Sequence, residues 1–348
     1  MVRISFSCLI SLAVLLLFGG HSLRAADETV AVRIVTFNAE LLSAPRVSPG
    51  QIDKYRFDDA RKQHLERVAA LIETLKPDVL NLVEVTSREA VDQLVAILHE
   101  KGLGDYRGYH IDSHDSFTAG DVAVIARFSP DMVENVPIRT IYSAAADPTW
   151  RQSFNFSNRG GEASTGTTSL DRNSLYFFTI AGHKLGFLGL HLRSNPQDGY
   201  ANAKRSGEAE VARRVLRSEI VARGYLPIVL GDLNDYDPDV PDRDHSRGTS
   251  TTVIRDLKDF DPDRTGAELV NVAERIVRVA DRYTSHWDRN ENRAHDGDDV
   301  YTMIDHILLP RELMPHVTRV FISHSLSVDT SDHYPVVVDL QLPMRGGP

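Results

Sequence analysis

Short runs of apolar residues recur along the whole chain, and this is the feature that most limits its fold. A strand with one face in water alternates apolar and polar residues, whereas several of these runs are apolar throughout and predict strands covered on both faces. The runs are Val32–Phe37, Val79–Val83, Val122–Ala126, Leu175–Ile180, Leu185–Leu190, Ile228–Leu230, Ile304–Leu309 and Val336–Leu340.

Segments with helical periodicity lie between these runs. We expect helices over Asp59–Leu75, which ends before Pro77, over Arg88–His99 and over Ala203–Arg223. Three polar stretches have low periodicity. We expect Tyr142–Asn173 to be a long surface loop or an insertion, and Asp237–Ser250 and Arg289–Asp299 to be further loops. Because strands and helices are mixed and no repeat or Gly/Ser linker divides them, residues 27–348 are expected to form one layered α/β domain.

The first 26 residues have the order of a secretory signal peptide. Arg3 precedes the apolar run Leu9–Phe18, and small residues at Ala25 and Ala26 follow. The apolar run is shorter than the roughly 20 residues that a membrane-spanning helix needs, although a retained N-terminal anchor is the alternative. We therefore expect a secreted or periplasmic protein without stable membrane insertion after cleavage. Cys8 is the one cysteine of the chain, so the mature protein would contain no disulfide.

The net charge limits how this chain can hold an anionic partner. The 39 Lys and Arg residues are outnumbered by 49 Asp and Glu residues, for a formal charge of −10. A protein that binds polyanions mainly through its overall charge would carry the opposite sign. Chemistry on phosphate groups therefore requires a local device, such as a metal ion or a few well-placed cations.

Polar residues stand at the ends of several predicted strands. One such residue alone is usually a turn cap, and a lone histidine is usually a surface residue or a hydrogen-bonded core residue. Glu84 directly follows Leu82-Val83 and is expected to be partly buried, so it needs a cation or hydrogen bonds. The complete set consists of Asn38, Glu84, His191, Asp232, Asn234, Asp305, Asp332 and His333.

This combination of residue types favours a narrow range of chemistry. Carboxylate and amide oxygens are ligands that suit a hard divalent ion such as Mg²⁺. Histidines beside carboxylates can contact phosphate oxygens or transfer protons near neutral pH. A metal that polarises a phosphoryl oxygen, together with an Asp that orients water, makes a phosphate-ester hydrolase.

The ordered motifs resemble those of the endonuclease/exonuclease/phosphatase superfamily, which includes deoxyribonuclease I. They run from Phe37-Asn38 through Gly231-Asp232-Leu233-Asn234 to Ser331-Asp332-His333 and cover about 300 residues. The resemblance implies a four-layer α/β sandwich: two packed mixed β-sheets flanked by helices, with the site where the strand ends meet. One departure is Val83, since the superfamily often has Gln before the metal-binding Glu.

The resemblance also implies a metal site. Glu84 would be the principal ligand, with Asn38 and Asp332 beside it. Mg²⁺ is the expected ion, and Mn²⁺ or Ca²⁺ are alternatives.

Catalytic roles follow from the same resemblance. Asp232 would orient or deprotonate the attacking water, and Asn234 would hold water or phosphate. His333, oriented by Asp305, would contact the scissile phosphate, and His191 would stabilise the phosphate or assist the leaving group. The reaction would be in-line attack of water without a covalent enzyme intermediate.

Some assignments stay open at the level of sequence. Arg193 is expected to bind a substrate phosphate, with a solvated loop cation as the alternative, and Arg172 and Lys204 are weaker candidates. A further polar group of the site is expected among His114, Thr118 and Asp121, and Trp287 is expected to pack rather than to stack on a base.

Three functions compete on these observations. The first is a secreted metal-dependent phosphodiesterase, most simply a nuclease, that acts as a monomer. The second is a phosphomonoesterase or a lipid or inositol phosphodiesterase with the same catalytic core, which the acidic charge mildly favours. The third is a non-catalytic binding protein, against which the intact set of acids and histidines argues.

Overall fold

The computed structural model describes residues 28–345, apart from residues 48–49, 116, 144–147, 159, 196–197, 245–250 and 293–295. The predicted leader, residues 1–26, lies outside the described residues. Within the described part, none of the helices is long and apolar enough to cross a membrane.

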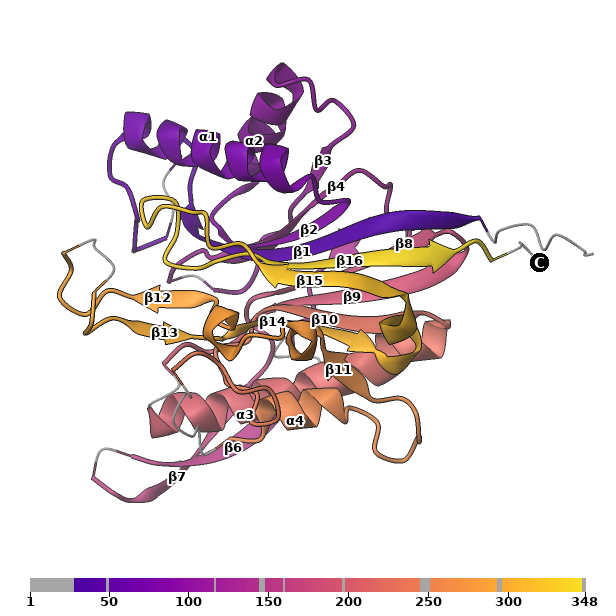
Figure 1. Ribbon diagram of the computed structural model, residues 1–348. Coiled ribbons are helices and arrows are strands. Elements are labelled where there is room, and N and C mark those ends of the chain that lie inside the picture. The colour runs from indigo at the N-terminus through magenta and orange to yellow at the C-terminus, as the bar shows by residue number, and fades with distance from the viewer. Residues whose placement is uncertain are drawn as a thin grey trace, which may run out of the picture.

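Among the described residues, two six-stranded sheets form the centre of the fold (Figure 1). The first has the order β15-β16-β1-β2-β4-β3 and the second the order β11-β14-β10-β9-β8-β5. Strands β1 and β2 are parallel, as are β9 and β10, while the other pairs are antiparallel, so both sheets are mixed.

The strands of the first sheet are β1 (Thr29–Leu42), β2 (Val79–Val85), β3 (Arg107–Tyr109), β4 (Asp121–Ala126), β15 (Val317–Ile322) and β16 (Val336–Pro343). The strands of the second are β5 (Ile138–Arg139), β8 (Asn173–Ile180), β9 (His183–His191), β10 (Leu226–Asp232), β11 (Leu269–Asn271) and β14 (Asp305–Pro310).

Helices cover the outer face of each sheet. The helices α1 (Asp58–Leu75) and α2 (Arg88–Glu100) lie over the first sheet, and α3 (Gly199–Val215) and α4 (Val253–Lys258) lie over the second (Figure 1). The described chain also contains short 3-10 or π-helical turns at Leu216–Ile220, Val221–Arg223, Val272–Arg275, Val279–Asp281 and Arg311–His316. The predicted four-layer α/β sandwich is confirmed.

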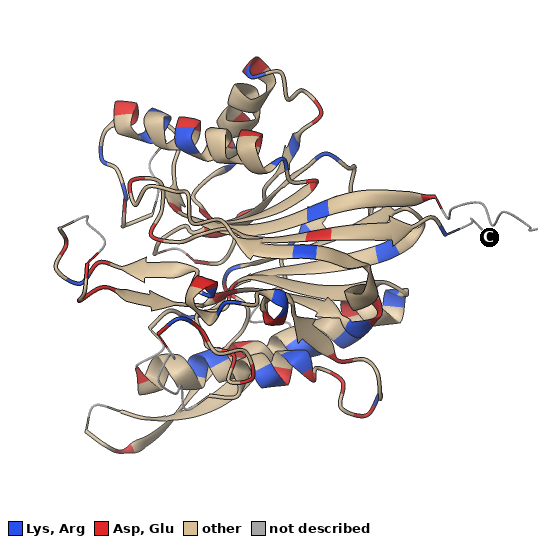
Figure 2. Cartoon of the chain, viewed as in Figure 1, with Lys and Arg blue, Asp and Glu red and all other residues tan. Residues whose placement is uncertain are grey.

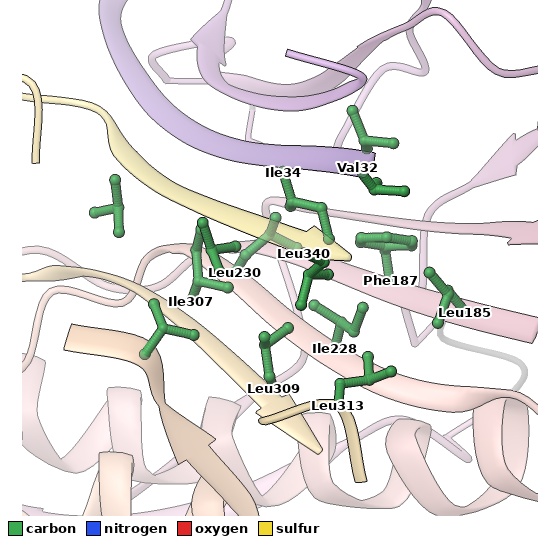
Figure 3. Close-up of a cluster of buried hydrophobic side chains, with 14 of the residues drawn as sticks. Val32, Ile34, Leu185, Phe187, Ile228, Leu230, Ile307, Leu309, Leu313 and Leu340 are labelled. Atoms are coloured by element: carbon green, nitrogen blue, oxygen red, sulfur yellow. The ribbon is translucent and has the colours of Figure 1, made fainter. Parts of the chain in front are cut away.

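Three apolar clusters hold the layers together. The first lies between the sheets and includes Val32, Phe187 and Leu230 (Figure 3). The second joins the first sheet to α1 and α2, and the third joins the second sheet to α3 and α4. The central strands contribute side chains to two clusters. In β1, for example, Ile34 faces the cluster between the sheets and Val35 faces the cluster under the helices. This explains the continuous apolar runs of the sequence.

At Gly189 the two sheets pack too closely to leave room for a side chain. A Cβ at this position would lie 2.1 Å from Asn81 Oδ1, which belongs to β2 of the facing sheet, and 2.9 Å from Val122 Cγ1. We expect Gly189→Ala to lower the free energy of unfolding by about 1–3 kcal/mol through overpacking. Gly104→Ala is the matched control, because nothing lies within 4 Å of its Cβ position. Denaturant unfolding of both variants checks this, and equal stabilities would contradict it.

The expected loop over Tyr142–Asn173 is wrong in its central part. Strands β6 (Gln152–Ser157) and β7 (Ala163–Thr168) pair as a hairpin that packs on α3. Buried Phe154 anchors the hairpin, while its remaining side chains are mostly polar and partly exposed. Because the hairpin buries so little apolar surface, its strands lack the strong pattern on which the prediction relied. The helix expected from Ala203 begins earlier, at Gly199, where Asp198 caps it.

Candidate active site

Five strands, β1, β2, β9, β10 and β14, bring the predicted site residues together at or near their ends. Asn38 lies near the end of β1 beside Val83 of β2, and Asp232 at the end of β10 pairs in register with both His191 and Asp305. The Asn38 side chain joins the two sheets, since its Nδ2 donates to Glu84 Oε1 at 3.1 Å and to Asp232 Oδ2 at 3.0 Å. The convergence that the sequence predicted for these residues is therefore present in the fold.

Unusual backbone conformations accompany these strand ends. Glu84 has φ of 60°, a left-handed value rare for a non-glycine residue, and it sits where the β2–β4 register shifts between Val83 and Val85. Asn234 has φ of 50°. Bulges re-aim a side chain, and strain of this kind is concentrated at functional sites. The bulge thus turns Glu84 toward Asp232, in the other sheet.

Glycine is required directly before Asp232. Gly231 has φ of 133°, and a Cβ there would lie 2.0 Å from the carbonyl oxygen of Leu190. The absence of a side chain therefore allows β10 to lie against β9 at the point where Asp232 and His191 pair.

The cluster suits a divalent cation. Ligand atoms of Glu84, His191 and Asp232 all lie within 4.8 Å of one another. Burial raises the pKa of Glu84, and the nearby carboxylates Asp232 and Asp332 raise it further. His333 and Asn38 act in the opposite direction and lower this pKa. Carboxylates crowded together with so little solvent need a positive charge between them. Oxygen donors of this type are those that Mg²⁺ prefers.

The three predicted metal ligands occupy different environments. The side chain of Glu84 is 19% exposed, whereas that of Asp332 is 51% exposed at the rim. Asn38 is buried, and its Oδ1 accepts from the backbone N–H of Glu40 at 2.9 Å. Asn38 thus turns its amide nitrogen, and not the oxygen that would bind a metal, toward Glu84 and Asp232, while Asp332 lies nearer to solvent.

The surroundings of the two site histidines shift their pKa values in opposite directions. His333 Nδ1 lies 2.7 Å from Asp305 Oδ2. Burial lowers the pKa of His333, but Asp305 and the other carboxylates outweigh this and hold it well above its usual value. For His191, burial together with Arg172 and His333 lowers the pKa well below its usual value. The surroundings thus favour the charged form of His333 and the neutral form of His191.

Both histidines face the carboxylates of the cluster. His191 Nε2 lies 3.6 Å from Glu84 Oε1 and 3.6 Å from Asp232 Oδ2, and His333 Nε2 lies 4.0 Å from Asp232 Oδ2. Asn234 is anchored near them, since its backbone N–H donates to Asp232 Oδ1 at 3.0 Å. A cationic donor, a neutral histidine and a buried carboxylate therefore face one small volume, which is what hydrolysis of a phosphate ester requires.

The basic residues predicted to bind a substrate phosphate lie in segments next to this cluster. Arg193 follows His191 by two residues and is exposed. Arg172 donates to the carbonyl oxygen of Leu192 at 2.9 Å. Lys204 is paired with Asp171 at 2.7 Å.

The sequence left His114, Thr118 and Asp121 as candidates for a further polar group of the site, and the structure shows which contacts two of them make. Asp121 is bound by His110 Nε2 at 2.8 Å and by the backbone N–H of Ser113 at 2.8 Å, which gives it a structural partner. Thr118 also has structural partners, since its Oγ1 donates to Asp115 and accepts from the backbone N–H of Gly120 at 3.0 Å.

Glu40 was missed by the sequence reasoning. Its Oε2 accepts from Lys54 Nζ and from the backbone N–H of Asp332 at 3.0 Å. Burial and Asp332 raise its pKa to about 7, although Lys54 opposes this. The available signal was position, since Glu40 stands two residues after Asn38.

The expectation that Trp287 packs in the core is wrong. Strand β12 (Ser285–Trp287), which pairs with β13 (Val300–Thr302), turns His286 inward against Tyr301 and Asp299. Because neighbouring strand residues face opposite sides, Trp287 points to solvent and is 58% exposed.

Comparisons with known proteins bear on the family and the fold of this chain. The family model described as "Endonuclease/Exonuclease/phosphatase family" matches residues 35–333. A search of curated proteins finds no match.

Solved structures share the fold at low sequence identity. An AP endonuclease from Archaeoglobus fulgidus is 18% identical, with a TM-score of 0.56 over 88% of this chain and 98% of that one. TDP2 from D. rerio, complexed with single strand DNA product, is 15% identical, with a TM-score of 0.52 over 89% and 98%. A family protein from Leptotrichia buccalis is also 15% identical, with a TM-score of 0.52 over 88% and 98%. The chain belongs to the endonuclease/exonuclease/phosphatase family.

Proposed function

We propose that this protein is an extracytoplasmic, divalent-metal-dependent phosphodiesterase that cleaves nucleic acid. The observation that carries the proposal is the buried cluster of Glu84, His191 and Asp232, with the His333–Asp305 pair beside it. Membership in the family supports phosphoester hydrolysis, and the leader-like residues 1–26 support export.

In this mechanism, Asp232 holds the attacking water and accepts its proton, because its carboxylate is buried and its pKa is raised toward neutrality. His333 donates a hydrogen bond from Nε2 to the scissile phosphate while Asp305 fixes its ring. His191 contacts a phosphate oxygen or the leaving group, and Asn234 holds the water or phosphate. Glu84, with Asn38 and Asp332, would hold the divalent cation. When bound, this ion polarises a phosphoryl oxygen and neutralises part of the charge that develops on it.

Nucleic acid is the favoured substrate because two relatives of the same fold are an AP endonuclease and a TDP2 bound to single strand DNA product. Lys and Arg residues are intermixed with Asp and Glu over the helices and strands in the view of Figure 2. An anionic substrate would therefore have to be bound by positive charge concentrated at the site itself. The metal, His333 and a few arginines at the site would supply that charge.

A substrate panel tests this proposal. The purified protein is assayed with Mg²⁺, Mn²⁺ or Ca²⁺ on plasmid DNA, RNA, bis-p-nitrophenyl phosphate, inositol phosphates and sphingomyelin. We expect cleavage of nucleic acid and of bis-p-nitrophenyl phosphate, loss of both with EDTA, and recovery on return of the metal. Exclusive turnover of the monoesters or of sphingomyelin would replace this proposal with the phosphomonoesterase or lipid phosphodiesterase. Turnover of none of them would favour the non-catalytic binding protein.

A further inference from the structure

Two hollows open beside the catalytic cluster and meet at one residue. The first, of about 530 Å³, is bordered by Thr118, Arg172, Arg193 and Lys204. The second, of about 640 Å³, is bordered by Arg193, Tyr200 and Phe156. Because Arg193 lines both, the two hollows lie next to each other at the start of α3, and the pair is called the groove below. Each volume lies in the range typical of small-molecule sites.

Residues that line the first hollow are neighbours of the catalytic residues. Thr118 Oγ1 accepts from the backbone N–H of Gly120 at 3.0 Å, and a Cβ at Gly120 would lie 3.6 Å from Glu84 Cγ. On its other side, the backbone N–H of His191 donates to the carbonyl oxygen of Arg172 at 3.1 Å. A chain whose scissile phosphate sits at His191 and Glu84 would therefore continue into this groove.

The acidic side chains that line the first hollow already form ion pairs or hydrogen bonds within the protein. Asp171 pairs with Lys204 at 2.7 Å, and Glu208 accepts from the backbone N–H of Arg193 at 2.8 Å. Asp115 accepts hydrogen bonds from Thr118. The guanidinium of exposed Arg193, by contrast, has no ion pair with any residue that the structure describes. It is therefore free to bind an external anion.

An aromatic surface lies at the far end of the groove. Tyr200 is 42% exposed as a residue. It packs edge-on against Phe156, at 4.8 Å between ring centroids, and against Phe154, at 5.6 Å. Phe154 is buried where the β6–β7 hairpin lies on α3. The hairpin thus holds Tyr200 in place and leaves part of its ring open, as a stacking surface requires.

We propose that this groove binds the single strand next to the scissile bond, with Arg193 on a neighbouring phosphate and Tyr200 stacked on a base. The inference rests on the proposed function and specifies its substrate as an unpaired polynucleotide strand. A base inside a duplex keeps its faces covered by its neighbours, so stacking on Tyr200 requires an unpaired base. A polymer is favoured over a small diester, because a small diester has no second phosphate for Arg193.

Binding is tested without catalysis, by fluorescence anisotropy of a labelled 12-nucleotide single strand in EDTA. We expect Tyr200→Ala to weaken binding about 5- to 100-fold, the effect of losing one base–aromatic stack, and Tyr200→Phe to restore most of it. Arg193→Ala should weaken binding and reduce the salt dependence by about one phosphate contact. Arg311→Ala is the matched control, since this exposed arginine pairs with Glu268 away from the groove.

The outcomes separate this inference from the proposed function. Under the inference, the single strand binds more tightly than a duplex of the same sequence, and both groove variants lower kcat/KM for the oligonucleotide relative to that for bis-p-nitrophenyl phosphate. Unchanged binding by both variants, or duplex binding that is equal or tighter, would overturn the groove assignment even if the enzyme is active. Absence of all turnover with intact single-strand binding would overturn the proposed function alone.

Discussion

Asp232→Asn is expected to lower kcat for phosphodiester cleavage by about 10²- to 10⁴-fold, the usual contribution of a positioned general base. The amide keeps the shape of the side chain but cannot accept the proton of the attacking water. Asp239→Asn is the matched control, because Asp239 is exposed and binds Lys258 on the surface. Circular dichroism and thermal unfolding of both variants check that the fold is retained. Wild-type kcat in a folded Asp232→Asn protein would remove Asp232 from the reaction.

The same residue sets the acid limb of the pH profile. Burial and the neighbouring Asp305 raise the pKa of Asp232 to about 6, against the opposing effect of His333. Because only the deprotonated carboxylate can accept a proton, kcat/KM should fall as the pH drops through this region. A bound divalent cation favours the charged form and places the limb at a lower pH. A pH profile without this limb in Asp232→Asn would agree with the assignment.

Arg205→Met is expected to lower the free energy of unfolding by about 3–5 kcal/mol, because it leaves a buried carboxylate without its cation. Arg205 is 0% exposed, and its Nε donates to Asp235 Oδ2 at 2.9 Å. Its other nitrogens bind the carbonyl oxygen of Arg193 and the side chain of Asn202. The pair fixes the segment after Asp232 to α3 beneath the catalytic strand ends.

A surface ion pair provides the matched control for that substitution. Arg88→Met breaks an exposed pair with Asp92, and such pairs contribute roughly 0–1 kcal/mol. The double variant Arg205→Met/Asp235→Leu should recover part of the lost stability, since it removes the unpaired charge. Chemical denaturation of the three variants measures this, and an Arg205→Met protein as stable as the control would contradict it.

Features that depend on local pattern were predictable from the sequence. Residues such as Val35 and Val229 lie in strands that pack on both faces, so their apolar runs could be recognised without knowledge of the fold. The residues that end those runs, Asn38, Glu84 and Asp232, could then be expected at one edge of the sandwich.

Features that depend on long-range packing were not predictable in this way. The bulge that turns Glu84 arises from a register shift against β4, which no local pattern records. Glu40 becomes part of the site through Asp332, a residue distant in sequence. The burial of His286 instead of Trp287 depends on which face of β12 meets Tyr301 and Asp299. The aromatic groove exists because the β6–β7 hairpin lies on α3.

The most direct test of the central claim is a crystal structure of the protein soaked in MnCl₂, with anomalous diffraction recorded for manganese. The account predicts a peak coordinated by Glu84, next to Asn38 and within reach of the Asp232 and His333 side chains. Glu84→Gln should weaken or remove this peak. A structure without manganese at Glu84, with the ion bound instead only at the acidic cluster of Asp296, Asp298 and Asp299, would contradict the account.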